Sequence, residues 1–365
     1  NSLCFDEGGP TAHPTLSFKM NTTVCITGAS GYVGSYVTQA CLQKGWIVHA
    51  TVRNPDKAEA VDHLKALPAQ LGVPESSLRL FAADLMKPGS YDEAVKGCTY
   101  AFHVAASLKL HADDPQKEII DVGVKGTQNF LESCAKCPDT LKRVVMTSSI
   151  AAVCSWKELT WTNGKPNLTF DESHYNDDPE AGPYLREKYL SEVLARDFCE
   201  KQPFDIVFIN PSLVIGPVMS RHHLNSSPRV IYEMGRGSFR MAPNFTFNIC
   251  HILDVADAHV KAAEAANPHN RYIISDAGYM SIFDMARVMR TAHPELSLPS
   301  ITMPYPLAWL LSWFHKDLAV LLGSIGQPML FSNERMRELL GSVRSADAAL
   351  VDCINCLVDN NMLDV

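Results

Sequence analysis

Between residues 22 and 210, short runs of apolar and β-branched residues alternate with longer stretches that carry apolar positions at helical spacing. Strands that alternate with helices predict βαβ units, which build a parallel sheet with both faces covered. The predicted strands are Thr23–Thr27, Ile47–Val52, Leu78–Ala82, Tyr100–Val104, Arg143–Thr147 and Asp205–Asn210. The predicted helices begin near Gly31, Asp56, Ser90, Pro115 and Pro183. This order predicts an α/β fold with a doubly wound parallel sheet.

The second half of the chain has a different pattern. Proline and glycine residues punctuate the stretch from 211 to 237, which is typical of loops. The stretch at about 249–275 has the pattern of a short strand and a helix that return to the sheet, and most of the remainder is helical. We therefore expect the sheet domain to comprise residues 21–214 and this returning segment. Residues 215–248 and 276–365 would form a smaller, mostly helical C-terminal domain.

Composition and net charge limit the kinds of molecule that we expect the chain to bind. Of the 365 residues, 46% are hydrophobic and 20% are charged, as in ordinary globular proteins with a core. The 32 basic and 40 acidic side chains give a net charge of −8, so the chain has no general attraction for phosphate backbones or anionic membranes. We therefore expect no nucleic-acid partner. Residues 1–20 lack the features of a secretory signal, and we expect a disordered leader or a tag there, with Met20 as the native start.

A late apolar segment runs from Pro304 to Ile325 and is interrupted by the polar residues His315, Lys316 and Asp317. Each half is much shorter than the ~20 residues that cross a bilayer. We therefore expect no membrane span, and we interpret the segment as helices that cover a pocket of the C-terminal domain. An exposed lid, or a helix pair that dips into a membrane surface, is the open alternative.

The eleven cysteines are scattered and odd in number, which is typical of a protein in the reducing cytoplasm. Cys25 and Cys250 lie in apolar runs, where a reduced thiol behaves as a small core residue. Two Cys-x-x-Cys pairs, Cys134/Cys137 and Cys353/Cys356, are far apart in the chain and sit in helical patterns. In a helix this spacing only places both thiols on one face. We therefore expect no metal site.

The first predicted strand runs directly into a glycine-rich loop that precedes a helix. Glycines at this point permit a tight turn, close approach to a pyrophosphate and close helix–sheet packing, while the N–H groups of the helix start hold the anion. The G-x-x-G-x-x-G spacing differs by one residue from the common fingerprint, but its place between strand and helix predicts dinucleotide binding by a Rossmann-type fold. The residues expected to contact the cofactor here are Gly28, Ser30, Gly31, Tyr32, Val33 and Gly34.

The end of the second strand indicates which dinucleotide is bound. NAD-specific sites place an acidic residue there to bind the ribose 2′-hydroxyl. In this chain the strand ends at Arg53, with no acid before Asp56. A guanidinium can bind a 2′-phosphate through charge-assisted hydrogen bonds, and Lys57 would add a second positive charge. The alternative is that Arg53 is a solvated loop residue; the pattern favours NADPH or NADP+.

Two further motifs suggest chemistry. The fifth strand ends in Ser148 and Ser149, at the edge where open α/β sheets bind ligands. Tyr184 and Lys188 open a later helix, one turn apart on one face. An unperturbed phenol has a pKa near 10, and a nearby ammonium favours the phenolate, so the pair suits proton exchange with a substrate oxygen. A tyrosine and a lysine at this spacing are common in helices. The pair indicates catalysis here because it follows a phosphate-binding loop and a serine at the end of a strand.

With these motifs in place, the chain resembles the extended short-chain dehydrogenase/reductase superfamily. Within it, the chain is similar to the dihydroflavonol 4-reductase-like group of NADPH-dependent carbonyl reductases. The resemblance covers the chain from about residue 22 to the C-terminus. It rests on the segments Ala50–Pro55, Ala83–Leu85, Ala101–Ala105, Thr147–Ser149, Tyr184–Lys188, Asn210–Pro217 and His251–Ala256.

The resemblance implies roles for individual residues. Ser149, rather than Ser148, would be the catalytic serine beside Tyr184 and Lys188, and Lys188 would also bind the nicotinamide ribose. Asp84 would accept a hydrogen bond from the adenine amino group. The further cofactor contacts that the resemblance implies are Leu85, Val104, Ala105, Ala106, Pro211 and Val214. The C-terminal domain would bind the substrate.

The chain also departs from the pattern of these relatives. Flavonoid reductases usually have an asparagine five residues after the catalytic serine, where this chain has Cys154. The Asn-Trp-Tyr-Cys-Tyr signature of cinnamoyl-CoA reductases is absent. Some relatives place a basic residue at the position of Ala60, so Lys57 would have to substitute for it. These differences leave the substrate open.

The leading hypothesis is NADPH-dependent reduction of a ketone or aldehyde by a cytoplasmic monomer or homodimer with a small apolar carbonyl substrate. Tyr184 would donate the proton, and Ser149 would polarise the carbonyl. Alcohol oxidation of the 3β-hydroxysteroid dehydrogenase kind would use the same residues. A sugar-nucleotide epimerase fits less well because Arg53 stands where such enzymes have an acid. A non-catalytic NADP(H)-sensing protein is a further alternative, against which the retention of Ser149, Tyr184 and Lys188 argues.

Overall fold

The computed structural model describes residues 22–106, 112–162, 165–238, 240–313, 322 and 325–363. The expectation of a leader or tag at residues 1–20 lies outside these ranges. So does most of the second half of the apolar segment that begins at Pro304.

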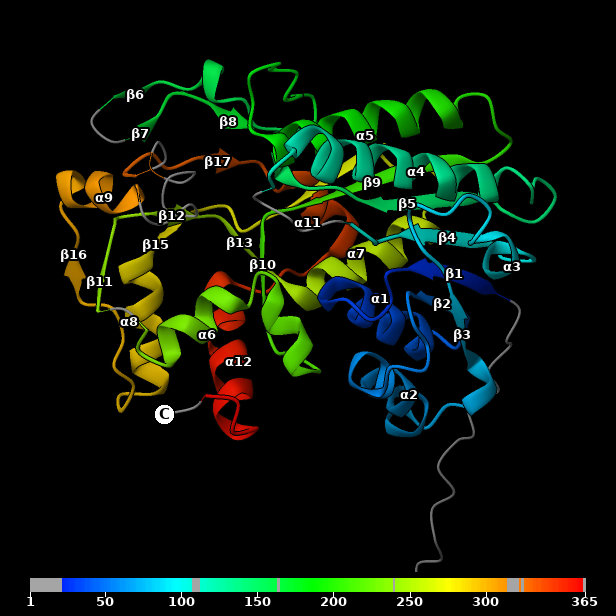
Figure 1. Cartoon of the computed structure of the whole chain (residues 1–365), viewed down its shortest axis with the longest axis horizontal. Helices are drawn as coiled ribbons and strands as arrows, with labels where there is room; N and C mark the ends of the chain where they lie inside the picture. The colour runs from blue at the N-terminus through cyan, green and yellow to red at the C-terminus, as the bar shows by residue number, and fades with distance from the viewer. Residues whose placement is uncertain are drawn as a thin grey trace, which may run out of the picture.

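A seven-stranded parallel sheet in the order β14-β9-β5-β4-β1-β2-β3 forms the centre of the molecule (Figure 1). Its strands are β1 (Thr23–Thr27), β2 (Ile47–Val52), β3 (Leu78–Ala82), β4 (Tyr100–His103), β5 (Arg143–Thr147), β9 (Asp205–Pro211) and β14 (Arg271–Ile274). The first six confirm the predicted strands to within one residue. The chain moves outward from β1 to β3 and then returns to β4 on the other side of β1. The point of reversal is the place where such sheets bind ligands.

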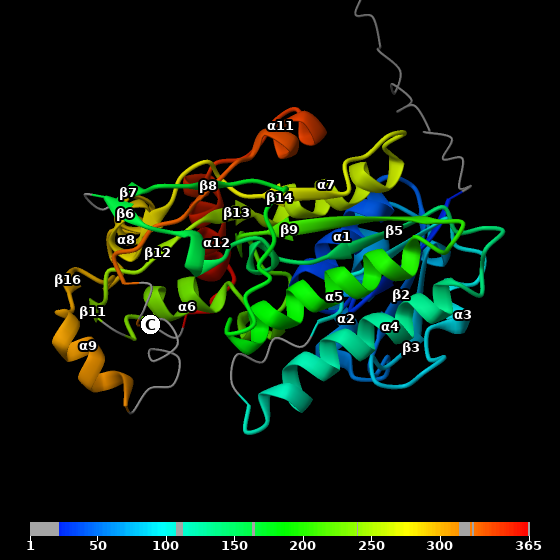
Figure 2. The same cartoon turned by 90° about the horizontal axis from the view of Figure 1, so that it is seen from above.

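Helices cover both faces of this sheet. On one face α4 (Asp121–Cys134) packs against α5 (Pro183–Cys199), and α3 (Asp92–Val95) lies beside α4. On the other face α1 (Tyr32–Gln43) packs against α7 (Ile252–Glu264) and α2 (Ala58–Leu71) (Figures 1 and 2). This double cover explains why the central strands read as continuous apolar runs. The structure therefore confirms the α/β fold with a doubly wound sheet.

The other described elements are short strands and helices. Four helices that follow β9 in the chain do not belong to the layers that cover the sheet: α6 (Arg229–Gly235), α8 (Ile282–Ala292), α9 (Tyr305–Ser312) and α12 (Ala346–Asp359). Helix α11 (Glu334–Leu340) packs against α7 and β14. Two-stranded pairs are β6 (Trp161–Thr162) with β7 (Lys165–Pro166), β8 (Thr169–Phe170) with β17 (Leu330–Phe331), β10 (Leu213–Ile215) with β13 (Ile249–His251), β11 (Met241–Ala242) with β16 (Ile301–Thr302), and β12 (Thr246–Phe247) with β15 (Met280–Ser281). Single turns are η1 (Glu75–Ser77), η2 (Gln116–Ile120), η3 (Ile150–Ala152), η4 (Trp156–Glu158) and η5 (Arg221–Asn225). Strand β13 with the helix after it was expected at about residue 249, but the other short strands were not predicted because two or three residues carry no detectable alternation.

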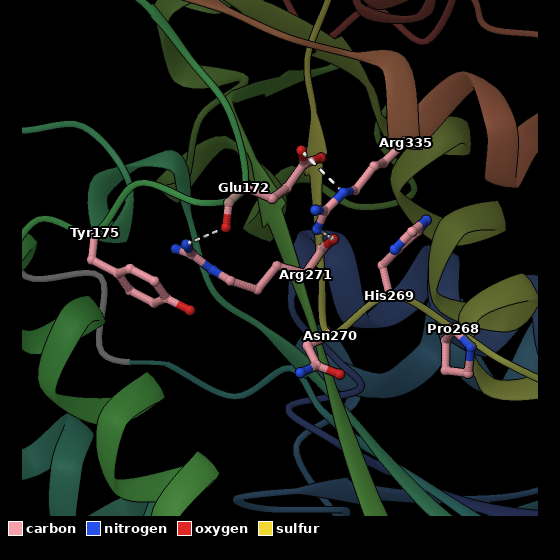
Figure 3. Close-up of a pocket in the computed structure, with 7 residues that line it drawn as sticks. All are labelled: Glu172, Tyr175, Pro268, His269, Asn270, Arg271 and Arg335. Atoms are coloured by element: carbon pink, nitrogen blue, oxygen red, sulfur yellow. Dashed lines mark hydrogen bonds and ion pairs between the residues drawn. The ribbon is translucent and has the colours of Figure 1, made fainter.

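Strand β14 is an edge strand of the sheet, and buried charged side chains form hydrogen bonds at this edge. The backbone N–H of Ile273 donates to the Glu172 carboxylate at 3.0 Å. The Arg271 guanidinium is almost fully buried and donates to the backbone carbonyls of Glu172 (3.1 Å) and His174 (2.6 Å). A cavity of about 330 Å³ opens beside these residues, between Tyr175, His269 and Arg335 (Figure 3). It adjoins the amino-terminal end of β14, whereas doubly wound sheets bind ligands at the carboxyl-terminal ends of their strands.

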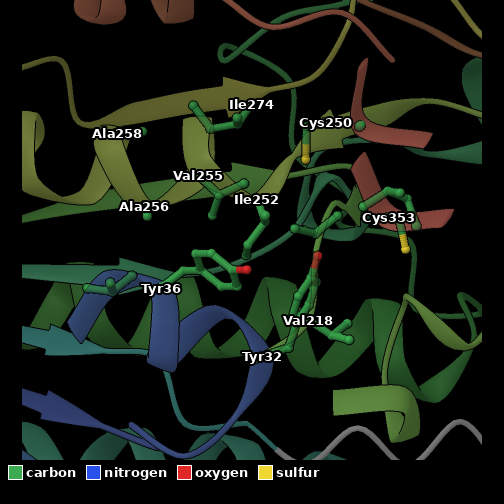
Figure 4. Close-up of a cluster of buried hydrophobic side chains, with 14 of the residues drawn as sticks. Tyr32, Tyr36, Val218, Cys250, Ile252, Val255, Ala256, Ala258, Ile274 and Cys353 are labelled. Carbon is green, nitrogen blue, oxygen red and sulfur yellow. The ribbon is translucent and has the colours of Figure 1, made fainter. Parts of the chain in front are cut away.

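The main apolar core joins α1 and α7 to the segment after β9 (Figure 4). Two tyrosines of α1 point into it: the Tyr32 hydroxyl donates to the Gly216 carbonyl and the Tyr36 hydroxyl donates to the Pro217 carbonyl, each at 3.0 Å. Tyr32 can therefore offer only its backbone to a ligand of the glycine loop. Cys25 and Cys250 are buried, as expected for core thiols.

The described half of the late apolar segment forms α9, and this helix is exposed. Its exposed large side chains, with Trp313 just beyond its end, are Tyr305, Leu307, Trp309, Leu310 and Trp313. In this structure these side chains face solvent rather than cover a pocket. A search of the described residues finds no helix that is both long and apolar enough to cross a bilayer.

Among the residues that the structure describes, five buried histidines have a lowered pKa, and for three of them, His103, His223 and His259, the lowering is large. Burial, and then the nearby Lys188 ammonium, lowers the pKa of His103 to about 3. Burial lowers the pKa of His259 to about 4, and burial followed by the neighbouring His63 lowers the pKa of His223 to about 3. Between these values and the ordinary histidine pKa, the unfolded chain binds protons that the folded protein does not.

We therefore expect the free energy of unfolding to decrease as the pH falls from about 6.5 towards 4, by up to ~1.4 kcal/mol per pH unit for each such histidine. Urea unfolding at a series of pH values measures this slope. In His259→Gln, which removes one titrating group, the slope should become shallower by up to that amount. A slope identical to that of the parent protein would show that His259 does not contribute to it.

Candidate active site

The glycine-rich loop has the geometry that its sequence predicts. Gly28 has a φ of +63°, and a Cβ atom on it would lie 2.8 Å from the Cα atom of Ala105 in the loop after β4. A Cβ atom on Gly34 would lie 2.2 Å from the Gly28 carbonyl oxygen. The first turn of α1 has no side-chain cap at Gly31 and no acidic residue. Its backbone N–H groups are therefore available to an anion such as a pyrophosphate.

Arg53 and Lys57 lie beyond the end of β2, the strand next to β1. Both side chains are exposed, and Arg53 has no hydrogen bond or ion pair with any other residue that the structure describes. Lys57 has only a distant ion pair with Glu59, at 3.9 Å. The backbone of Ala29 in the glycine loop donates to the Thr51 carbonyl at 3.1 Å, so the loop and the basic side chains belong to the same edge of the sheet.

The residues after β3 and β4 lie at this same edge. Asp84 is exposed, and its carboxylate accepts from the backbone N–H of Met86 at 2.8 Å. The N–H groups of Val104 and Ala105 both donate to the Thr27 hydroxyl at 3.0 Å, which fixes the loop after β4 against the glycine loop. Leu85 packs on Gly126 of α4, and Ala106 is exposed.

Ser149 follows β5 in an extended conformation and begins turn η3. Its hydroxyl oxygen accepts from the backbone N–H of Ala151 at 3.1 Å, so its own hydrogen is free to donate to another oxygen. The side chain of Asn210 donates to the Ser149 carbonyl at 3.0 Å and to Glu192 at 2.6 Å. Sequence analysis had not identified Asn210 as a support of the serine.

Tyr184 and Lys188 lie in the first two turns of α5, which packs against η3. Tyr184 is half-buried, and Lys188 is only 4% exposed. The Lys188 ammonium nitrogen lies 5.6 Å from the centroid of the Tyr184 ring. The structure thus brings the predicted serine, tyrosine and lysine to the carboxyl-terminal edge of the sheet, which is also the edge of the glycine loop.

The charge of Lys188 is balanced inside the protein. The Glu187 carboxylate lies 3.3 Å from the ammonium nitrogen. Burial is the largest influence and by itself would lower the pKa of Lys188, but Glu187, Tyr184 and Glu192 together outweigh it and hold that pKa above its ordinary value. The contact between Glu187 and Lys188 was not predicted from the sequence, because the side chains of consecutive helix residues usually point in different directions.

Pro211 and Val214, which were expected to flank the nicotinamide, are both buried; Pro211 ends β9 and Val214 lies in β10. The adjacent histidines His222 and His223 both lie in turn η5, where His222 is exposed and His223 is buried. In the part of the chain that the structure describes, no group of three or more histidine, cysteine or acidic side chains could hold a metal ion.

Known proteins with the same features fall into one family. The NAD dependent epimerase/dehydratase family matches residues 24–275. Cinnamoyl-CoA reductase CAD2 of Medicago truncatula is 38% identical over 291 residues, which cover 78% of this chain and 84% of the relative. A dihydroflavonol 4-reductase of Solanum lycopersicum is 32% identical over 286 residues, covering 76% and 71%.

Solved structures agree on the fold. The yeast methylglyoxal/isovaleraldehyde reductase Gre2, complexed with NADPH, superimposes with a TM-score of 0.75 at 21% identity and covers 93% of this chain and 99% of its own. Vestitone reductase from alfalfa, Medicago sativa, superimposes with a TM-score of 0.69 at 24% identity over the same shares of the two chains. The chain belongs to the NAD dependent epimerase/dehydratase family, in the dihydroflavonol 4-reductase-like group of extended short-chain dehydrogenases/reductases.

Proposed function

We propose that this oxidoreductase reduces a ketone or aldehyde to the alcohol with NADPH, using Tyr184 as the proton donor. The observation that carries the proposal is the buried, charge-balanced Lys188 ammonium 5.6 Å from the centroid of the Tyr184 ring, on a helix that packs against the turn begun by Ser149. The assignment of a reductase is also supported by the names of the relatives, which are reductases.

The cofactor site fits a dinucleotide with a 2′-phosphate. The glycine loop leaves no room for Cβ atoms at Gly28 and Gly34, and it ends in an uncapped helix start. Arg53 is exposed and free to bind the 2′-phosphate, with Lys57 nearby. Asp84, Leu85 and the loop from Val104 to Ala106 would contact the rest of the nucleotide, and Pro211 and Val214 would flank the nicotinamide. When bound, NADPH supplies the hydride.

The residues of the chain provide the proton and hold the oxygen. Ser149 donates a hydrogen bond to the carbonyl oxygen of the substrate and orients it towards the Tyr184 hydroxyl. Tyr184 transfers its proton to this oxygen as negative charge develops there. The Lys188 ammonium stabilises the phenolate that remains and binds the nicotinamide ribose. Alcohol oxidation would use the same groups in reverse.

The position five residues after Ser149 holds Cys154 instead of the asparagine that flavonoid reductases usually have there, so it offers a substrate no amide for polar contacts. Cys154 is buried in an apolar cluster with Leu159, Phe170 and Phe331. We therefore propose a small apolar carbonyl compound as substrate. The ten cysteines in the described part of the chain are unpaired, which supports a reducing, cytoplasmic location. We expect the protein to be a monomer or a homodimer there.

Tyr184→Phe should lower kcat for carbonyl reduction by about 10²- to 10⁴-fold, because it removes the proton donor. NADPH binding should be retained, since the ring is preserved. Loss of NADPH absorbance against a panel of aldehydes, ketones, ketoesters and a flavanonol measures turnover. Tyr189→Phe, on the same helix, is the matched control and should behave as the parent protein. Comparable turnover in Tyr184→Phe would rule out this role.

Arg53→Ala should weaken NADPH binding by about 10- to 100-fold, the effect of losing a charge-assisted hydrogen-bonded pair. Affinity for NADH should be nearly unchanged, because NADH has no 2′-phosphate. Titration of both cofactors by fluorescence gives the two dissociation constants. Arg79→Ala removes another exposed arginine, on β3, and should change neither. An equal loss of affinity for both cofactors would contradict the assignment.

A further inference from the structure

Glu187 is an unusual neighbour for the lysine of the site. Glu187 and Lys188 are consecutive residues of α5, and each is only 4% exposed. Burying a carboxylate is unfavourable unless it is paired and hydrogen-bonded. The position of Glu187 therefore requires specific partners.

Two groups of α5 supply these partners. The Ser191 hydroxyl donates to Oε1 of Glu187 at 3.0 Å. The Lys188 ammonium lies 3.3 Å from Oε2, and this oxygen has no hydrogen-bond partner among the described residues. The carboxylate thus directs one oxygen to the helix and the other to the lysine.

Helix α4 is shaped to admit this carboxylate. A Cβ atom on Gly123 would lie 2.1 Å from Oε1 of Glu187 and 2.4 Å from its Cδ and Cγ atoms. Any larger residue at 123 would expel the side chain of Glu187 from its place. The pairing therefore depends on two helices that are more than sixty residues apart in the sequence.

We infer that Glu187 is a positioning residue that holds the Lys188 ammonium in place and, through it, sets the pH range in which Tyr184 exchanges its proton. This inference rests on the proposed function. Glu187 touches neither the substrate nor the cofactor in this role. It acts through the lysine.

The other charged groups around this pair are already neutral or occupied. On β4, His103 stays neutral because burial, and then Lys188, lowers its pKa to about 3. On α5, Glu192 lies 3.1 Å from the Arg271 guanidinium. At the start of α4, Asp121 pairs with Lys125 at 2.8 Å, and in the preceding turn Lys117 pairs with Asp114 at 2.8 Å. Among the described carboxylates, Glu187 is the one in contact with the Lys188 ammonium.

The sign of the effect follows from the charges. The Lys188 ammonium lies 5.6 Å from the centroid of the Tyr184 ring and 3.3 Å from Oε2 of Glu187, so the three side chains form one set of interacting groups. Removing a negative charge from the set makes each remaining proton easier to lose. Carbonyl reduction needs the protonated phenol, so activity should then disappear at a lower pH.

Glu187→Gln tests the inference, because it keeps the shape and the acceptor for Ser191 but removes the charge. The alkaline limb of kcat/KM for carbonyl reduction should move to lower pH by about one unit or more. Glu200→Gln, an exposed glutamate at the end of the same helix, is the matched control and should leave the limb in place. Gly123→Ala, which displaces the carboxylate by contact, should move the limb in the same direction.

The outcomes separate the two proposals. If Tyr184→Phe keeps its activity, the proposed function fails and the limb does not belong to Tyr184. If Tyr184→Phe is inactive but folded Glu187→Gln or Gly123→Ala retains the parent limb, the role of Glu187 is overturned and the proposed function stands. A lower melting temperature with an unmoved limb would also overturn it, because the carboxylate would then only support the fold.

Discussion

The close approach of the loops after β1 and β4 is the constraint on which the site depends. Gly28 and Ala105 meet at a distance that leaves no space for a Cβ atom, and the Thr27 hydroxyl binds the backbone of both Val104 and Ala105. This contact lies where the strand order reverses, at the carboxyl-terminal edge of the sheet. The helix that follows the first loop has its uncapped start at the same edge.

The residues proposed for proton transfer lie at the same edge, in the other half of the sheet. Ser149 stands at the end of β5, and its backbone is tied to Asn210 of β9. Asn210 in turn binds Glu192, which pairs with Arg271 of β14. A chain of buried polar groups therefore connects the serine to the edge strand. The ion pair between Glu192 and Arg271 offsets the cost of burying both charges, which explains why charged side chains are found in the interior here.

Helix α5 contributes to both halves of this arrangement. Its first turns carry Tyr184 and Lys188, and its buried residues include Glu187, Ser191 and Glu192. The lysine is almost fully buried, so its positive charge is maintained by a carboxylate and not by water. Buried pairs of this kind hold a charge in a defined place more than they stabilise the fold.

The strand pattern, the glycine loop and the order of Ser149, Tyr184 and Lys188 could be read from the sequence, because they depend on local periodicity and on motifs that are continuous in the chain. The six predicted strands agree with the structure to within a residue. The two-residue strands and the inward direction of the Tyr32 side chain could not be predicted, since neither leaves a local signal. The domain boundaries and the individual cofactor contacts stay predictions.

What the sequence by itself determined was the type of fold and the residues that could do chemistry. Only the tertiary structure decided which charges surround them. Gly123 and Glu187 carry no recognisable motif, and their relation appears only when α4 and α5 pack together. Electrostatic effects depend on distance and burial, and these are properties of the folded protein, so the environment of the lysine could not be deduced from the order of its residues.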